Sequence, residues 1–272
     1  MSIDRIKEVF RKTQAAGRRA WVPYFTAGFP DREICRELIL RADRFGATVI
    51  EVGFPYSDSI ADGPIIQGSH HEVLSRGHRV ADTFELVEEL RPSLSAAVVA
   101  MVSCSVIHRI GVIKFMSQLA KAGFDGVLVP DVPFEESAGF VDAAKKADLG
   151  YVGLIAPTTK PDRRALIASA STGFVYQMAH AGITGERSTI PLSLKAEVAQ
   201  TRLHARVPIC VGFGVSTPAQ VRAICQIADG VIVGSAIMRR LQEGVQACVG
   251  RSQQIEEISA FLMELAEAAQ AD

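Results

Sequence analysis

Two carboxylates stand where acid/base chemistry could use them. Glu51 interrupts the otherwise apolar segment 49–52, and an ionised glutamate in a protein core is costly without a partner. At the end of a buried strand its pKa would rise toward neutrality, as a proton donor and acceptor requires. Asp62 follows a loop long enough to fold back toward Glu51. Taken alone, Glu51 is equally well explained as a hydrogen-bonded structural carboxylate, and residues 62–64 as an ordinary turn.

Three glycine-containing turns, residues 182–185, 212–214 and 234–235, follow the last three apolar segments of the chain. Glycine lets backbone N–H groups approach an anion, and the hydroxyls of Thr184 and Ser235 could donate as well. A helix beginning at Ala236 would point its N-terminus at the same place. Any one of these glycines could simply form a tight turn, but together they predict a phosphate site.

Other catalytic groups do not stand in suitable places. No lysine ends the sixth apolar segment, so we do not expect imine chemistry. The six histidines form no metal-ligand pattern, and we expect His70 and His71 to lie on an exposed helical turn. We therefore expect a carboxylate acid/base reaction on a small phosphorylated substrate, without a metal or cofactor in this chain.

The elements that must position these groups alternate between apolar strands and amphipathic helices. This alternation predicts parallel strands joined by right-handed crossovers. Eight strands favour a (β/α)8 TIM barrel, formed by residues 1–272 as a single domain, over the alternative of an open doubly wound sheet. Residues 1–12 are predicted to form an extra N-terminal helix. The predicted strands are 21–26, 47–52, 96–102, 126–129, 151–155, 174–177, 207–211 and 230–233, and the predicted helices include 33–45, 112–122, 135–147, 163–169, 192–203 and 218–227.

Composition sets limits on location and partners. The formal net charge of −1 provides no basic excess for nucleic acid or for an anionic membrane. The five cysteines form no CxxC pair, which favours a reducing compartment. No apolar run approaches the roughly 20 residues that span a bilayer. We expect a cytoplasmic protein.

The segment 51–67, EVGFPYSDSIADGPIIQ, resembles the signature of the tryptophan synthase alpha chain family. Further similar segments follow in order over nearly the whole chain: 23–30, 129–136, 156–159, 182–185, 212–214 and 234–236. The resemblance implies a lyase that cleaves indole-3-glycerol phosphate by a retro-aldol reaction. It also implies an alpha2-beta2 heterotetramer in which the beta chain carries pyridoxal phosphate.

The resemblance also implies roles for individual residues. Glu51 would be the general acid and base, and Asp62 would bind the indole N–H and stabilise the indolenine cation. Two further groups match family positions. The indole pocket corresponds to Tyr24, Ile66, Leu128, Tyr176, Phe213 and Ile232, and the phosphate site to Thr184, Gly185, Gly214, Gly234 and Ser235.

Three segments depart from the family pattern: Ser59 replaces a proline, residues 102–105 lack the usual tyrosine, and residues 177–181 replace a small or hydroxylated run. These changes concern contact with the beta chain more than the chemistry. Two alternatives therefore stay open: a barrel of low activity that mainly binds and activates a beta chain, and a lyase that works alone.

Overall fold

The computed structural model of the protein describes residues 2–60, 62–180 and 191–270. Its parallel strands pair with their neighbours in chain order, and β8 pairs with β1 to close a barrel. This confirms the predicted (β/α)8 fold, with strand ends within two residues of those expected. The strands are β1 (Ala20–Thr26), β2 (Val49–Gly53), β3 (Ala97–Met101), β4 (Gly126–Leu128), β5 (Gly150–Ile155), β6 (Val175–Met178), β7 (Ile209–Gly212) and β8 (Gly230–Val233).

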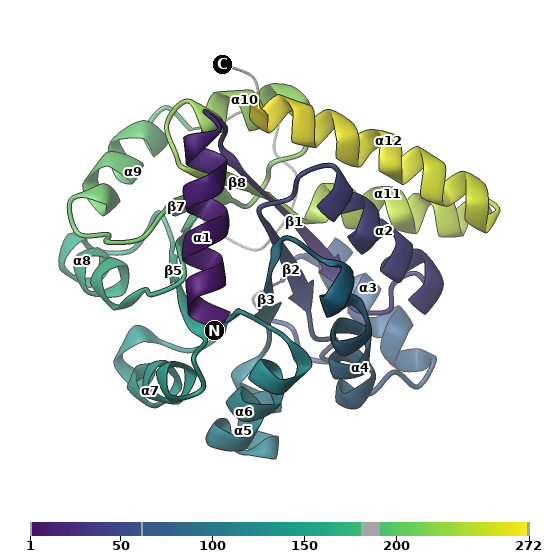
Figure 1. Ribbon diagram of the computed structural model, residues 1–272, viewed down its shortest axis with the longest axis horizontal. Coiled ribbons are helices and arrows are strands. Elements are labelled where there is room, and N and C mark those ends of the chain that lie inside the picture. The colour runs from purple at the N-terminus through teal and green to yellow at the C-terminus, as the bar shows by residue number, and fades with distance from the viewer. Residues whose placement is uncertain (1, 61, 181–190, 271–272) are drawn as a thin grey trace.

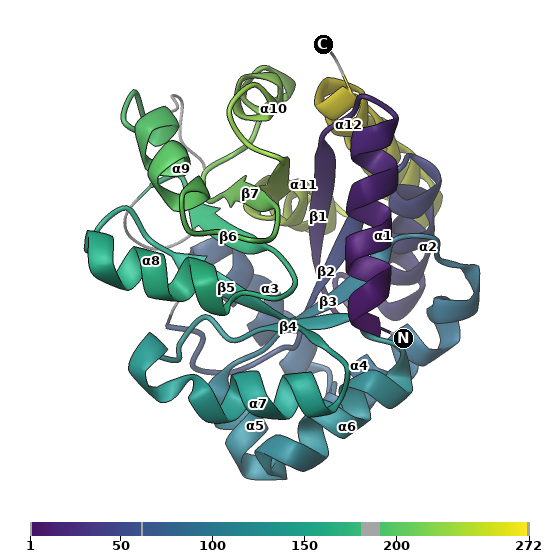
Figure 2. The same ribbon diagram turned by 60° about the vertical axis from the view of Figure 1, so that its left-hand side comes forward.

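Helices surround the barrel and bury their apolar faces against the strands (Figures 1 and 2). Local signals fix their ends: the Asp31 side chain accepts the Ile34 N–H at the start of α2, and Thr217 forms a capping box with Gln220 in α10. The helix predicted over 135–147 is divided into a 3-10 turn, Phe134–Glu136, and α7. The helices are α2 (Arg32–Arg44), α3 (Pro64–Ser75), α4 (Val80–Leu90), α5 (Cys104–Ile110), α6 (Val112–Ala122), α7 (Ala138–Lys146), α8 (Pro161–Ala170), α9 (Leu194–Arg202), α10 (Pro218–Cys225), α11 (Ser235–Gln246) and α12 (Arg251–Gln270).

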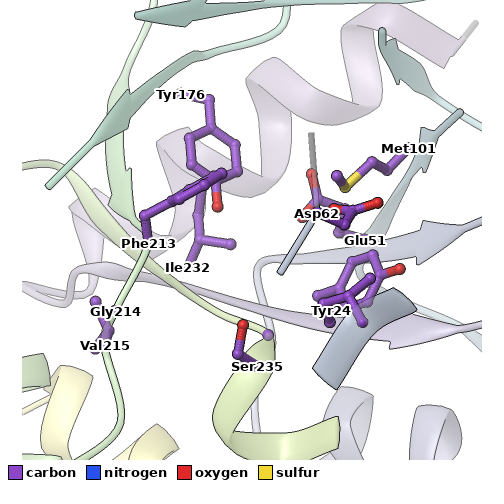
Figure 3. A pocket seen from close by; sticks show the side chains of 12 residues that line it. Tyr24, Glu51, Asp62, Met101, Tyr176, Phe213, Gly214, Val215, Ile232 and Ser235 are labelled. Carbon is purple, nitrogen blue, oxygen red and sulfur yellow. The ribbon is translucent and has the colours of Figure 1, made fainter. Parts of the chain in front are cut away.

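The predicted N-terminal helix is α1 (Ser2–Ala15), and it covers the amino end of the barrel (Figure 2). Ile6 is fully buried among the inward-facing side chains, and the ring of Phe10 lies 6.0 Å from that of Phe174. A Cβ at Gly150 would lie 2.8 Å from the Ile6 side chain, so glycine there makes room for the helix. The opposite, carboxyl end of the barrel carries Tyr24 and Glu51 (Figure 3).

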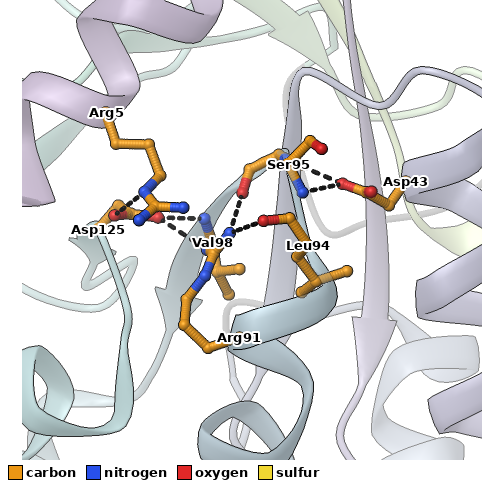
Figure 4. A network of polar contacts seen from close by, with 8 residues as sticks. Arg5, Asp43, Arg91, Leu94, Ser95, Val98 and Asp125 are labelled. Carbon is orange, nitrogen blue, oxygen red and sulfur yellow. Dashed lines mark hydrogen bonds and ion pairs between the residues drawn. The ribbon is translucent and has the colours of Figure 1, made fainter.

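A buried ionic network joins β3 and β4 at the amino end (Figure 4). Asp125 accepts the Val98 N–H at 2.9 Å and lies 3.1 Å from Arg91 and 3.3 Å from Arg5. Arg91 also donates to the Ala96 carbonyl. Because each buried charge is both paired and hydrogen-bonded, the network fixes the strand starts without leaving an uncompensated charge.

The rim opposite this network depends on close packing between β1 and β2. Tyr24 stands in register beside Glu51, and its ring crosses over Gly53. A Cβ at Gly53 would lie 2.0 Å from the Tyr24 hydroxyl oxygen, which no real structure tolerates. Gly212, at the end of β7, likewise leaves room for Tyr176, because a Cβ at Gly212 would lie 2.4 Å from the Tyr176 hydroxyl oxygen. The two glycines therefore leave room for both tyrosine rings.

We predict that Gly53→Ala destabilises the protein by about 1–3 kcal/mol, because the added methyl group forces the Tyr24 ring out of its place. Urea denaturation followed by circular dichroism measures the change. The matched control is Gly139→Ala in α7, where a Cβ meets nothing within 4 Å and alanine should stabilise the helix by up to about 1 kcal/mol. Equal stabilities for the two variants would contradict the packing described here.

Candidate active site

A cavity of about 410 Å³ opens at the carboxyl end of the barrel (Figure 3). In a barrel this is the end at which the strands and the loops after them bring distant residues together. The residues that line it come from β1, β2, β3, β6 and β8, from the loops after β2, β7 and β8, and from the first turns of α3 and α11. The lining residues are Tyr24, Glu51, Asp62, Ile66, Met101, Tyr176, Phe213, Gly214, Val215, Ile232, Gly234 and Ser235.

Glu51 projects from the centre of β2 and is 1% exposed. Its Oε1 atom has no hydrogen-bond partner among the described residues. Burial raises the pKa of Glu51 to about 8, and the nearby charge of Asp62 contributes in the same direction. At neutral pH Glu51 is therefore mostly a protonated acid that faces the cavity.

Asp62 reaches the same cavity from the loop that leads into α3. Helix α3 holds this loop in place, because the Gln67 side chain donates to the backbone carbonyls of Ser59 and Asp62 at 3.0 and 2.8 Å. Asp62 is 4% exposed, and its Oδ1 atom is also without a hydrogen-bond partner among the described residues. Burial raises the pKa of Asp62 to about 7, with a further contribution from the charge of Asp131. The fold thus brings the two predicted carboxyls together.

The far side of the cavity has the features of an anion site. Gly234 precedes α11, and Ser235 is its first residue, so the N–H groups of that helix end face the cavity. Phe213 and Gly214 turn with positive φ values of 72° and 87°, which lets the backbone after β7 approach a ligand closely. Two predicted phosphate residues, Thr184 and Gly185, lie outside the described residues.

The cavity walls between the two carboxyls and the turns around Gly214 and Gly234 are mainly apolar and aromatic. The rings of Tyr176 and Phe213 meet edge to face with centroids 5.9 Å apart, and Ile232 lies beside them (Figure 3). Leu128 does not line the cavity: it is buried inside the barrel, and its register partner Met101 lines the cavity instead.

Met101 and Val215 are lining residues that the sequence reasoning missed. Both stand at the carboxyl ends of strands, Met101 as the last residue of β3 and Val215 just after the β7 turn. This position is itself a signal, since in a barrel the site forms at those ends. It could have identified both residues without any motif.

The prediction that His70 and His71 are both exposed is wrong for His70. His71 is exposed on α3, whereas His70 is 4% exposed and its Nε2 atom lies 3.2 Å from the Tyr24 hydroxyl. The helix turns its inward face toward β1, so adjacent histidines meet opposite environments. Burial lowers the pKa of His70 to about 4, and the ring is neutral at physiological pH.

Over residues 2–60, 62–180 and 191–270, no three or more His, Cys, Asp or Glu side chains form a group that could hold a metal ion. Within the same described ranges, no helix is both long and apolar enough to cross a membrane.

Comparison with known proteins points to one family. Residues 10–270 match the model of the tryptophan synthase alpha chain family. The tryptophan synthase alpha chain of Gloeobacter violaceus is 38% identical over 270 residues, covering 99% of this chain and 96% of its own length. That of Picosynechococcus sp. is 40% identical over 243 residues, covering 89% of this chain and 92% of its own.

Solved structures agree. A structure of tryptophan synthase from Mycobacterium tuberculosis superposes with a TM-score of 0.88 at 33% identity, covering 98% of this chain and 99% of that one. The alpha subunit from Legionella pneumophila gives a TM-score of 0.87 at 29% identity, covering 97% and 98%. The barrel, its cavity and the sequence relationships lead to one conclusion: this chain belongs to the tryptophan synthase alpha chain family.

Proposed function

We propose that Glu51 and Asp62 carry out the lyase reaction of this family in this chain, the cleavage of indole-3-glycerol phosphate to indole and glyceraldehyde 3-phosphate. The observation that carries the proposal is the pair of buried carboxyls, each with an oxygen that lacks a partner among the described residues, across an apolar cavity from the turns around Gly214 and Gly234. An acid, an apolar slot and an anion site in one cavity suit a substrate with an indole ring at one end and a phosphate at the other.

In the proposed reaction, Glu51 carries out both proton transfers. Protonated Glu51 donates to indole C3, and the ionised Asp62 accepts a hydrogen bond from the indole N–H and stabilises the indolenine cation that forms. The Glu51 carboxylate then removes the proton of the glyceryl hydroxyl next to the breaking bond. That oxygen becomes the aldehyde of glyceraldehyde 3-phosphate, the carbon–carbon bond breaks, and its electron pair restores the indole ring.

The remaining site residues bind and orient the substrate in this proposal. Gly214, Gly234 and Ser235, together with Thr184 and Gly185, hold the phosphate through N–H and hydroxyl groups. The apolar and aromatic walls exclude water from the reacting carbon, which strengthens the electrostatic contribution of Asp62. The wall residues are Tyr24, Ile66, Tyr176, Phe213 and Ile232, with Leu128 packed behind Met101.

We further propose a beta chain as the partner, in an alpha2-beta2 assembly within the cytoplasm. The chemistry above needs no cofactor in this chain, so pyridoxal phosphate would belong to the beta chain. The loop between the two carboxyls supports a docking role, because Ile60 is 78% exposed beside Ser59 at the rim of the barrel. An apolar side chain at such a place suits a protein interface.

We predict that the purified chain forms indole from indole-3-glycerol phosphate, and that Glu51→Gln lowers kcat by about 100-fold or more because C3 loses its proton donor. Asp62→Asn should lower kcat similarly by removing the charge opposite the cation. Asp58→Asn changes a carboxylate elsewhere on the same loop and should retain activity when no beta chain is present. Wild-type protein that forms no indole, alone or with a beta chain, would overturn the proposed function.

The pH profile of kcat/KM should be bell-shaped. The proposal needs Asp62 ionised and Glu51 protonated, so activity should rise through the Asp62 pKa of about 7 and fall through the Glu51 pKa of about 8. Steady-state assays from pH 5.5 to 9.5 measure both limbs. A profile that stays flat through pH 9.5 would contradict protonated Glu51 as the acid.

Stability should show the same ionisation without any substrate. Because the folded-state pKa of Glu51 is raised above the value of 4.5 for a free glutamate, the native protein loses stability as pH rises toward and through 8. Glu51→Gln removes this loss, so the Tm of the variant relative to wild type should be higher at pH 9 than at pH 6. Calorimetry at both pH values measures it, and a Tm difference independent of pH would refute the raised pKa.

A further inference from the structure

A buried chain of hydrogen bonds runs from α3 to the edge of the cavity. His70 Nε2 lies 3.2 Å from the Tyr24 hydroxyl, which lies 3.2 Å from Thr26 Oγ1. Thr26 Oγ1 lies 2.7 Å from Ser69 Oγ, and Ser69 donates to the Ile66 carbonyl at 2.7 Å. The four side chains in this chain of hydrogen bonds are each less than 5% exposed, so bulk water does not compete for these bonds.

The hydrogen-bond directions show that Tyr24 uses its single proton within this chain of bonds. Each hydroxyl has one proton, and Ser69 gives its own to the Ile66 carbonyl, so Thr26 donates to Ser69. When His70 carries its proton on Nε2, Tyr24 donates to Thr26. The neutral His70 ring then donates its Nε2–H to the Tyr24 oxygen. With the other histidine tautomer, Tyr24 would donate to Nε2 instead. In both arrangements the single proton of Tyr24 is used within the chain of bonds.

This use of the proton matters because the reacting carboxyls are close by. Tyr24 stands in register beside Glu51, and both Asp62 and Glu51 are near enough to raise the pKa of its phenol, after the larger effect of burial. Among the described residues, no hydrogen bond joins the Tyr24 hydroxyl to either carboxyl, and Glu51 Oε1 and Asp62 Oδ1 stay unpartnered. A hydroxyl beside a carboxylate would otherwise donate to it, since charge-assisted bonds are the stronger ones.

We infer that His70 is a positioning residue that holds the Tyr24 hydroxyl away from Asp62 and Glu51 and so keeps both carboxyls available to the substrate. Thr26 alone gives one contact of 3.2 Å, which is longer than the usual range of about 2.5–3.0 Å for a bond between two hydroxyls. His70 supplies the second contact and holds the phenol oxygen on the α3 side. Without it, the Tyr24 proton is free to turn to Asp62, occupying the oxygen that the indole N–H needs.

The test rests on the proposed function and uses the full chain in the indole-forming assay. His70→Leu, which cannot hydrogen-bond, should lower kcat by about 10-fold, and the acid limb of the kcat/KM profile should move to lower pH because a bond from Tyr24 stabilises ionised Asp62. His70→Gln, whose amide can still donate to Tyr24, should restore most of the activity. The matched control is His71→Leu, which changes the exposed neighbour on the same helix and should leave both the rate and the profile unchanged.

The decisive comparison adds Tyr24→Phe, which removes the hydroxyl that His70 holds. In the Tyr24→Phe background, His70→Leu should cause no further loss of kcat and no further shift of the acid limb. If the loss from His70→Leu is as large with phenylalanine at position 24 as with tyrosine, His70 has only a packing role and the inference fails. Should His70→Leu not fold, His70→Asn, whose shorter amide does not reach Tyr24, serves in the same comparison.

The two proposals can fail separately. Absence of indole from the wild-type chain, with and without a beta chain, overturns the proposed function. An active wild type with an unaffected His70→Leu variant overturns the role of His70 alone.

Discussion

The site depends on keeping two carboxyl groups in an apolar environment without satisfying them. Glu51 and Asp62 lose hydration on folding, and this loss raises the pKa of both groups. A fold that gave each carboxyl a lysine or several N–H donors would be more stable, but it would hold both groups ionised and engaged. The unsatisfied carboxyls therefore cost stability, and they also have pKa values near neutral, as the proposed acid and base require.

At the other end of the barrel, a buried carboxyl is paired and hydrogen-bonded instead. Asp125 is about as buried as Asp62, yet it is paired with Arg91 and Arg5 and accepts a backbone N–H. The two aspartates thus show opposite treatments of the same chemical group. At the amino end, Asp125 is paired and hydrogen-bonded at the starts of β3 and β4. At the carboxyl end, Asp62 Oδ1 has no hydrogen-bond partner among the described residues.

Much of this arrangement could be predicted from the sequence, for physical reasons. Apolar strands alternating with amphipathic helices leave few folds, and Glu51 is conspicuous because a carboxylate inside an apolar strand needs an explanation. His70 escaped prediction because the rotation of α3 decides which of two adjacent histidines faces β1, and that depends on packing by distant residues. The sequence predicts Leu128 in the pocket and does not single out Met101, because the two are register partners and the sequence alone does not show which of them lines the cavity.

The helix that covers the amino end of the barrel has a consequence for the whole molecule. Ile6 fills the space left by glycines at the starts of two strands, so α1 closes the amino end of the barrel interior. The cavity opens onto the two carboxyls at the carboxyl end, and in the proposed reaction the substrate would fill that opening. In the proposed reaction, the exclusion of water would then depend both on the ligand at the carboxyl end and on α1 at the amino end, although the two do not touch.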